Sequence, residues 1–172
     1  MAALPGIYTA TKKDGSTYYR ASITYLKKHI SLGSFTTEEL ASRTYREARL
    51  ILDHAEITLS EYSLFSCLSH DKFVCLINFR DNGIYFKTPI YLRRKYFEYH
   101  MSATEILKFD RDDLFFYASK KIQKKGGQQS YLQPLPGFAA GVEYRVAHNA
   151  VVLEADYIDE GHAPAVETEH EQ

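Results

Sequence analysis

A period-two alternation between Tyr18 and Tyr25 constrains the fold more than any other feature of this chain. The odd positions are apolar or aromatic, with Tyr19, Ala21 and Ile23 as examples, whereas the even positions are mostly polar. Successive side chains of a strand point to opposite faces, so this pattern indicates a strand with one buried face and one face in water.

Two turn signals place a strand on each side of this one. Asp14-Gly15 is typical of a type I′ hairpin turn, in which both central residues need positive φ, and it joins the run Gly6–Thr11 to the alternating strand. Lys27-Lys28 marks a second reversal before Ile30 and Leu32. The segment therefore predicts a three-stranded antiparallel sheet.

A helix is expected directly after the sheet. Thr36 and Glu39 have the spacing of a capping box, which marks a helix N-terminus. Apolar residues follow at helical spacing, which gives the helix one stripe to lay on the sheet. This stripe consists of Leu40, Ala41, Tyr45, Ala48 and Leu52.

The stretch Ile30–Phe35, the Thr-Thr-Glu-Glu that follows it, and Ala41, Tyr45 and Ala48 carry a family resemblance. Residues 6–55 resemble the DNA-binding domain of the plant ethylene-response factors, relatives of which occur in integrases and homing endonucleases. The resemblance implies a sheet laid in the major groove, with alternate strand residues touching phosphates and base edges.

At the groove-facing positions where that family has arginines and tryptophans, this chain has mostly other residues, and Arg20 is the strong candidate that remains. The substituted positions are Tyr8, Ala10, Tyr18, Thr24 and Ser31. We therefore expect contacts mainly to phosphates, with an ordinary solvated sheet face as the alternative. The predicted contact residues are Tyr18, Arg20, Ser22, Thr24, Lys27, Lys28 and His29, with Lys12 and Lys13 at the margin.

The middle of the chain predicts a second small α+β unit. Lys72–Arg80 is a strand candidate, Asp81-Asn82-Gly83 a hairpin turn and Ile84–Lys87 its partner, and Tyr91–Tyr99 continues the sheet. Asp110–Lys125 indicates a helix that Gly126-Gly127 stops.

Basic side chains in this unit are further candidates for phosphate contact. They are Arg93, Arg94, Lys95, Lys120, Lys121, Lys124 and Lys125. For the four lysines there is an alternative, because acidic residues at the start of a helix and basic residues at its end are favoured by the helix dipole without any ligand.

Residues 70–127 resemble bacterial and phage proteins of the HNH endonuclease-like kind, several of which carry a similar N-terminal domain. Nuclease chemistry of that kind needs a histidine to activate water, together with further metal-binding or proton-transferring groups. The nearest pair among the seven histidines, His148-Asn149, is followed by a predicted strand with no second His or Asn one helical turn on. We therefore expect no catalytic activity.

The C-terminal segment is acidic. Residues 132–172 contain one Lys or Arg against eight Asp or Glu, and no Lys or Arg follows Glu154. Its low hydrophobicity is typical of a flexible, solubilising tail. The alternative is that its carboxylates mimic phosphates or bind another protein. The candidates for such protein binding are Glu154, Asp156, Asp159 and Glu160.

Two cysteines, Cys67 and Cys75, fit no strong zinc pattern, so we expect neither a metal site nor a cofactor. No apolar run approaches the roughly twenty residues that span a bilayer, and the N-terminus lacks an apolar signal core. The expected location is the cytoplasm of a bacterial host.

The sequence therefore predicts an α+β protein with three segments: a DNA-binding-like domain at 1–56, a degenerate nuclease-like domain at 61–153 and an acidic tail at 154–172. The leading hypothesis is a non-catalytic, double-stranded-DNA-binding protein of phage or mobile-element origin. The competing hypothesis is a phage inhibitor of a host nuclease, such as a CRISPR effector. Dimerisation is left open.

Overall fold

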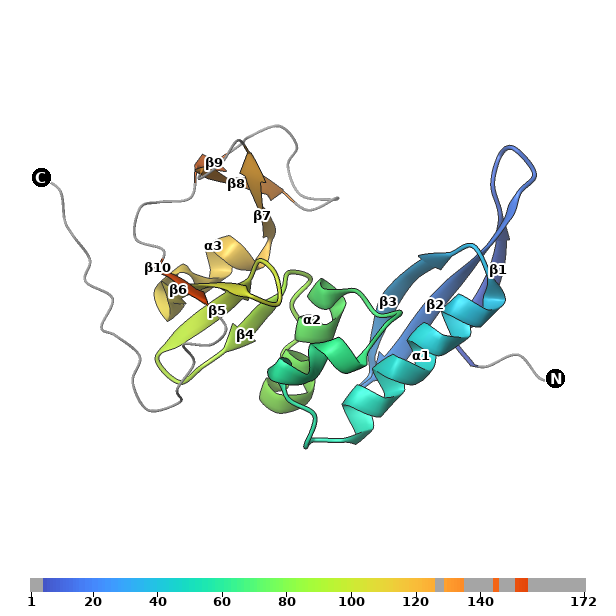
Figure 1. The fold of residues 1–172 in the computed structure, drawn as a ribbon, viewed down its shortest axis with the longest axis horizontal. Helices are drawn as coiled ribbons and strands as arrows, with labels where there is room; N and C mark the ends of the chain where they lie inside the picture. Colours follow the sequence, from blue (N-terminus) through green and yellow to red (C-terminus); the bar gives the residue numbers. More distant parts are fainter. Residues whose placement is uncertain (1–4, 126–128, 135–143, 146–150, 155–172) are drawn as a thin grey trace, which may run out of the picture. The chain divides into compact units, whose positions relative to one another are not determined.

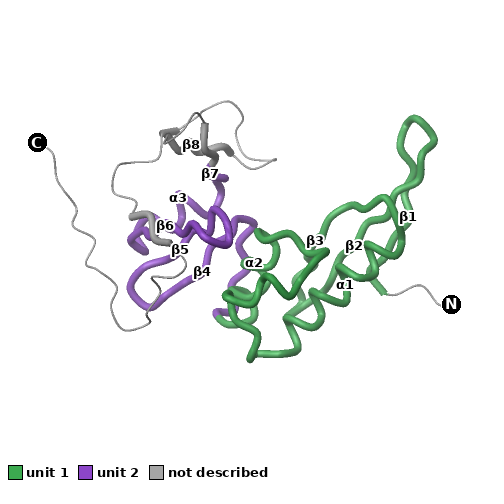
Figure 2. The backbone as a smooth tube through the Cα atoms, viewed as in Figure 1, with its two compact units in different colours: residues 1–81 green, residues 82–172 purple. Residues whose placement is uncertain are grey.

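The computed structural model describes residues 5–125, 129–134, 144–145 and 151–154. The chain divides into two compact units, residues 1–81 and residues 82–172, which Figure 2 shows in different colours. The predicted α+β class is confirmed.

The first unit begins with the predicted antiparallel sheet, in the order β1-β2-β3. Its strands are β1 (Ile7–Thr11), β2 (Thr17–Tyr25) and β3 (Lys28–Phe35). Helix α1 (Glu38–Asp53) lies along one face of this sheet (Figure 1). The sheet and the helix predicted here are therefore both present.

The core between the sheet and α1 is formed by strand residues that face the helix and by one apolar face of the helix. Buried apolar side chains from the sheet and from α1 form it: Ala21, Ile23, Ile30, Leu32, Ala41, Ala48, Ile51 and Leu52. Leu32 has no partner in the β2–β3 register, which shifts between Ala21 and Ser22, so β3 carries a bulge there.

Two local details of this sheet and helix differ from the prediction. The α1 N-cap is Thr37, whose hydroxyl accepts the Leu40 N–H at 3.2 Å, and the predicted cap Thr36 stands one residue too early. In the β1–β2 loop the N–H of Gly15 donates to the carbonyl of Lys12, and Gly15 alone of the predicted turn pair has positive φ. A longer turn that ends on a left-handed glycine is the next commonest hairpin connection.

The predicted strand Lys72–Arg80 is wrong, because this segment is helix α2 (His70–Asn82), which follows the short 3₁₀ helix η1 (Leu59–Leu64). All seven residues from Phe73 to Phe79 are buried, so the run shows no periodicity, and an apolar run of this kind does not distinguish a strand from a buried helix. The predicted hairpin turn Asp81-Asn82-Gly83 is instead the end of α2, and Gly83, at φ +74°, follows its last residue. Ile84–Lys87 forms no strand.

Two side chains connect α1 to the segments after it. The guanidinium of Arg80 donates to the carbonyls of Ile51 (2.9 Å), His54 (2.8 Å) and Ile57 (2.7 Å). It thereby supplies donors at the end of α1, whose last turn contains no basic residue. The carboxylate of Glu47 accepts the backbone N–H groups that precede α2, those of Ser66, Cys67 and Leu68.

The second unit contains an antiparallel sheet in the order β10-β6-β5-β4. The strands are β4 (Ile90–Leu92), β5 (Tyr96–His100), β6 (Glu105–Asp110) and β10 (Val151–Glu154). One face of this sheet contributes to an aromatic core with Phe97, Phe109 and Tyr117. The Phe109 and Tyr117 rings are stacked with centroids 4.1 Å apart.

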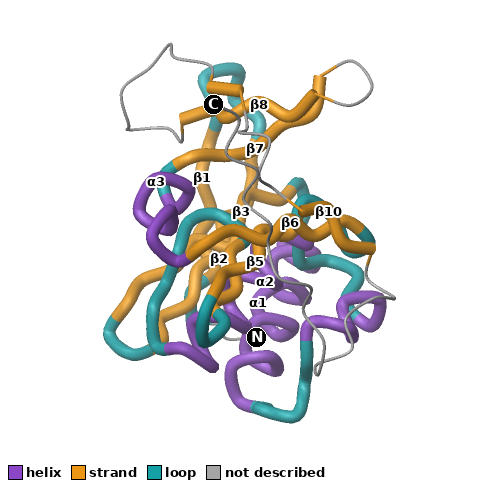
Figure 3. Tube along the Cα trace, turned by 90° about the vertical axis from the view of Figure 1, so that its left-hand side faces the viewer, coloured by secondary structure: helices purple, strands orange, loops and turns teal. Residues whose placement is uncertain are grey.

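The predicted helix Asp110–Lys125 is also wrong. Only η2 (Arg111–Asp113) and α3 (Leu114–Ala118) are helical, and the chain then enters strand β7 (Lys120–Lys125), as Figure 3 shows. β7 pairs with β8 (Gln129–Pro134), and β8 pairs with β9 (Tyr144–Arg145). This strand pairing overrides the helical pattern. The predicted helix stop, Gly126-Gly127, lies outside the described residues.

Candidate nucleic-acid interface

The face of the β1–β3 sheet opposite α1 is the surface to which the sequence assigns nucleic-acid contact. In the strand register Tyr8 stands beside Arg20, and Arg20 beside Ser34. Further along, Thr24 stands beside His29. Neighbouring residues in these rows share a face of the sheet. All five side chains are exposed, so the predicted surface is solvent-accessible.

Arg20 is held in place by Tyr18, two residues before it on the same strand. Its Nη2 donates to the Tyr18 phenolic oxygen at 2.7 Å, and its guanidinium carbon lies 5.4 Å from the centroid of the ring. A guanidinium has five N–H donors, so this single bond restricts the side chain and leaves donors for a phosphate. The pair is therefore a partly preorganised cationic group on the exposed face of the sheet.

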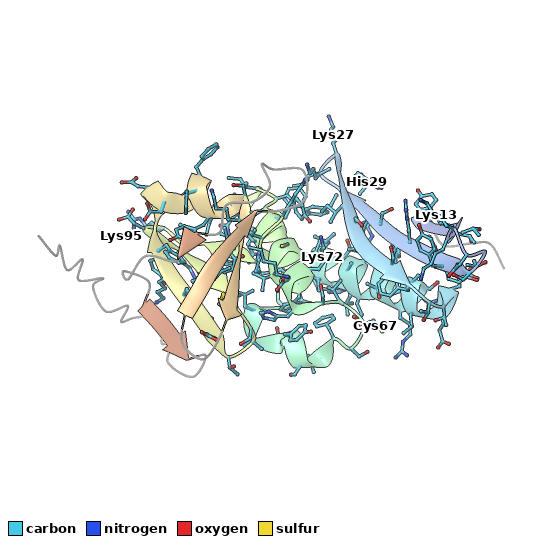
Figure 4. All side chains as sticks on the ribbon, turned by 90° about the horizontal axis from the view of Figure 1, so that it is seen from above. Lys13, Lys27, His29, Cys67, Lys72 and Lys95 are labelled. Atoms are coloured by element: carbon cyan, nitrogen blue, oxygen red, sulfur yellow. The ribbon has the colours of Figure 1, made fainter. Side chains whose placement is uncertain are left out.

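Lysines stand at both ends of the sheet. Lys12 and Lys13 are exposed in the β1–β2 loop, and Lys27, Lys28 and His29 are exposed at the β2–β3 turn. Figure 4 shows Lys13 at one end of the sheet and Lys27 and His29 at the other. β2 has nine residues, so the two groups are separated by about 30 Å at roughly 3.3 Å per residue. Arg20 lies between them.

Ser22, another predicted contact residue, is buried. Its N–H donates to the Gly6 carbonyl at 2.8 Å, and its hydroxyl lies 3.5 Å from the same oxygen. Gly6 has φ +96°, and a Cβ placed on it would stand 2.2 Å from the Ser22 carbonyl oxygen. Because Ser22 is only 6% exposed beside this close approach, its side chain offers almost no surface to a ligand.

Arg93 is partly exposed and is engaged in an ion pair within the second unit. Its guanidinium contacts the fully buried carboxylate of Glu98, with Nε 3.2 Å from Oε1, and lies 4.6 Å from the centroid of the Tyr91 ring. Nε2 of the buried His100 is 3.2 Å from Oε2 of the same carboxylate. Arg94 and Lys95 are exposed in the β4–β5 turn.

Electrostatics holds Glu98 in its charged form. Burial raises the pKa of this carboxyl, but the hydrogen bond with His100 and the charge of Arg93 outweigh it, so the pKa lies below its ordinary value. Burial lowers the pKa of Arg93, and the Glu98 charge more than offsets this effect and raises it. The pair is therefore structural. Both partners lie within five residues of Glu98, but the sequence does not show that this carboxylate is buried.

The four predicted lysines of the second unit all belong to β7 rather than to the end of a helix. The helix-dipole explanation for Lys120, Lys121, Lys124 and Lys125 therefore does not apply. Lys120 Nζ donates to the Phe116 carbonyl at 3.1 Å and lies 3.7 Å from the centroid of the Phe116 ring. Lys121 is exposed.

Of the residues predicted for protein binding, Glu154 is the last residue of strand β10 and pairs with Glu105 of β6. Asp156, Asp159 and Glu160 lie outside the described residues, as does His148-Asn149.

Among the described residues, no group of three or more His, Cys, Asp or Glu side chains could hold a metal ion. Cys75 is buried, and burial raises the pKa of its thiol to about 12. In the described part of the chain no helix is long and apolar enough to cross a membrane.

No family model, no curated protein and no solved structure matches this chain. The resemblances to the ethylene-response-factor domain and to HNH endonuclease-like proteins therefore stay predictions. The fold and the candidate surface define an α+β protein whose N-terminal sheet has one face covered by a helix and a polar, partly cationic outer face.

Proposed function

We propose that this protein binds double-stranded DNA, without catalysis, through the outer face of the β1–β3 sheet. The observation that carries the proposal is the position of Arg20, which is exposed, fixed by Tyr18 and flanked by lysines at both ends of the sheet. A row of separated cations along a surface is suited to a duplex backbone, whose phosphates recur along its length.

The side chains beside Arg20 favour backbone contact over base reading. Base-specific recognition in the major groove relies on bidentate pairs, most often from Arg, Lys, Asn or Gln. The rows next to Arg20 contain Tyr8 and Ser34 instead, and Thr24 stands beside His29. The proposed complex is therefore held mainly by phosphate contacts, and its sequence preference is weak.

A pair of charge-matched double variants tests this surface. Arg20→Ala/Lys27→Ala removes two cations from the proposed interface, and Arg43→Ala/Arg46→Ala removes two exposed cations from α1, which covers the other face. Titration into a labelled mixed-sequence duplex is expected to show at least about tenfold weaker binding for the first variant and near wild-type binding for the second. Equal losses in both variants would contradict a sheet-face interface.

The inhibitor hypothesis stays a prediction, because three of its four residues lie outside the described part of the chain.

A further inference from the structure

The β2–β3 hairpin turns through two residues in an unusual backbone conformation. Leu26 has φ 46° and Lys27 has φ 63°, between the paired residues Tyr25 and Lys28. Two left-handed residues in a row are the requirement of a type I′ turn, for which Asn-Gly or Asp-Gly is strongly preferred. A left-handed conformation at a bulky residue such as leucine is an outlier.

The exposure of Leu26 to water is also energetically unfavourable. Leu26 is an apolar side chain that is 63% exposed at the tip of the hairpin, and its neighbours Lys27, Lys28 and His29 are exposed as well. Backbone conformation and solvation would both be better served by asparagine at this position. Strained residues of this kind cluster at active sites, ligand clamps and switch regions.

The strands that carry the tip are anchored to the body of the unit. The ring of Tyr25, the last residue of β2, packs edge-on against Phe79 of α2 with centroids 5.3 Å apart. On the other side of the turn, Ile30 of β3 is buried in the core. Figure 4 shows Lys27 at the tip, pointing away from the sheet. Leu26 is therefore presented on a supported hairpin.

We propose that Leu26 is a wedge that enters a base-pair step of the bound duplex, while Lys27 and Lys28 contact the flanking phosphates. This inference rests on the proposed DNA binding. Apolar side chains inserted between base pairs unstack them at a cost of a few kcal/mol per step, which contacts to the distorted duplex offset. Pyrimidine–purine steps deform most readily, so the wedge gives a preference for flexible steps without base-reading arginines.

The test uses two duplexes of equal length and charge, one with a central TA step beside 2-aminopurine and one with a stiff A-tract around the same probe. With the wild-type protein, 2-aminopurine fluorescence is expected to rise in the TA duplex, because this fluorophore brightens when it is unstacked, and the TA duplex should bind more tightly. Leu26→Asn is expected to abolish the rise and to weaken binding to the TA duplex about tenfold, the lower end of what burial of a leucine contributes.

Two controls separate the wedge from other effects. Leu64→Asn removes another exposed leucine, one on η1, and is expected to leave both the fluorescence and the affinity unchanged. Leu26→Asn keeps every charge, so the salt dependence of binding should stay as in the wild type, and its melting temperature should not fall because asparagine tolerates this turn.

Tight binding by the wild type with no change in fluorescence, or a Leu26→Asn variant that unstacks the probe like the wild type, would overturn the wedge and leave the DNA-binding proposal standing. A wild-type protein that binds neither duplex would overturn both.

Discussion

The guanidinium of Arg20 donates a hydrogen bond to the phenolic oxygen of Tyr18 over 2.7 Å on the outer face of the N-terminal sheet. The bond restricts a side chain that would otherwise lose rotamer entropy on meeting a phosphate. Because this hydrogen bond lies on an exposed face, the proposed interface has a preorganised arginine at its centre.

Tyr18→Phe tests this relationship directly. The change removes the acceptor and keeps the ring, so we expect about twofold to fivefold weaker binding to duplex DNA, the size of one modest hydrogen bond. The melting temperature should hardly move, because the contact is at the surface. Unchanged affinity in a fluorescence titration would show that the bond does not prepare Arg20 for binding.

Arg80→Met is expected to destabilise the first unit by about 2–4 kcal/mol. Arg80 supplies charged donors to three carbonyls around the end of α1, and a hydrogen bond from a charged group contributes roughly 1.5–3 kcal/mol. Urea unfolding followed by circular dichroism measures the loss. Arg49→Met, which breaks only the exposed pair with Asp53, serves as the control and should change stability by less than about 0.5 kcal/mol.

The lowered pKa of Glu98 predicts that this residue stabilises the protein more at neutral pH than in acid. Its pKa in the folded protein is lowered, so its stabilising contribution is complete above the ordinary carboxyl pKa and is lost as pH falls through that value towards the lowered one. The free energy of unfolding of Glu98→Gln should therefore lie below that of the wild type at neutral pH, and the two should converge as the solution is acidified below about pH 4. A constant difference across this range would exclude the assigned ionisation.

Arg93→Met probes the same pair from the other side. It leaves a buried carboxylate without its main cation, and we expect a loss of about 3–5 kcal/mol in equilibrium unfolding. The adjacent Arg94→Met removes an exposed charge and is expected to cost less than about 0.5 kcal/mol. Equal effects of the two substitutions would refute the structural role of Arg93.

The sequence determines the N-terminal sheet and helix α1 well because their signals are local. The alternation around Ala21 and Ile23 and the apolar spacing from Ala41 to Leu52 describe one-sided elements, which period and capping chemistry identify. The rest of the chain is harder to predict. Phe73–Phe79 is buried on every side and has no period, and Lys120–Lys125 is a strand because it pairs with Gln129–Pro134.

The candidate site shows the same division. Arg20, Thr24 and His29 share the outer face because strand alternation puts them there, which a sequence reveals. The burial of Ser22 depends on the close approach of Gly6 beside a bulge, and the burial of the Glu98 carboxylate depends on tertiary packing. The left-handed turn at Leu26 could not be predicted, because the sequence there lacks the asparagine or glycine that indicates such a turn.

The most direct test of the central claim is the affinity of the purified protein for a mixed-sequence duplex at several salt concentrations between roughly 50 and 200 mM. Phosphate-dominated binding predicts a linear fall of log affinity with log salt, with a slope near −0.9 for each phosphate neutralised, and a slope shallower by about two in Arg20→Ala/Lys27→Ala. Binding that is absent at the lowest salt, or that persists unchanged across the range, would contradict DNA recognition by this sheet.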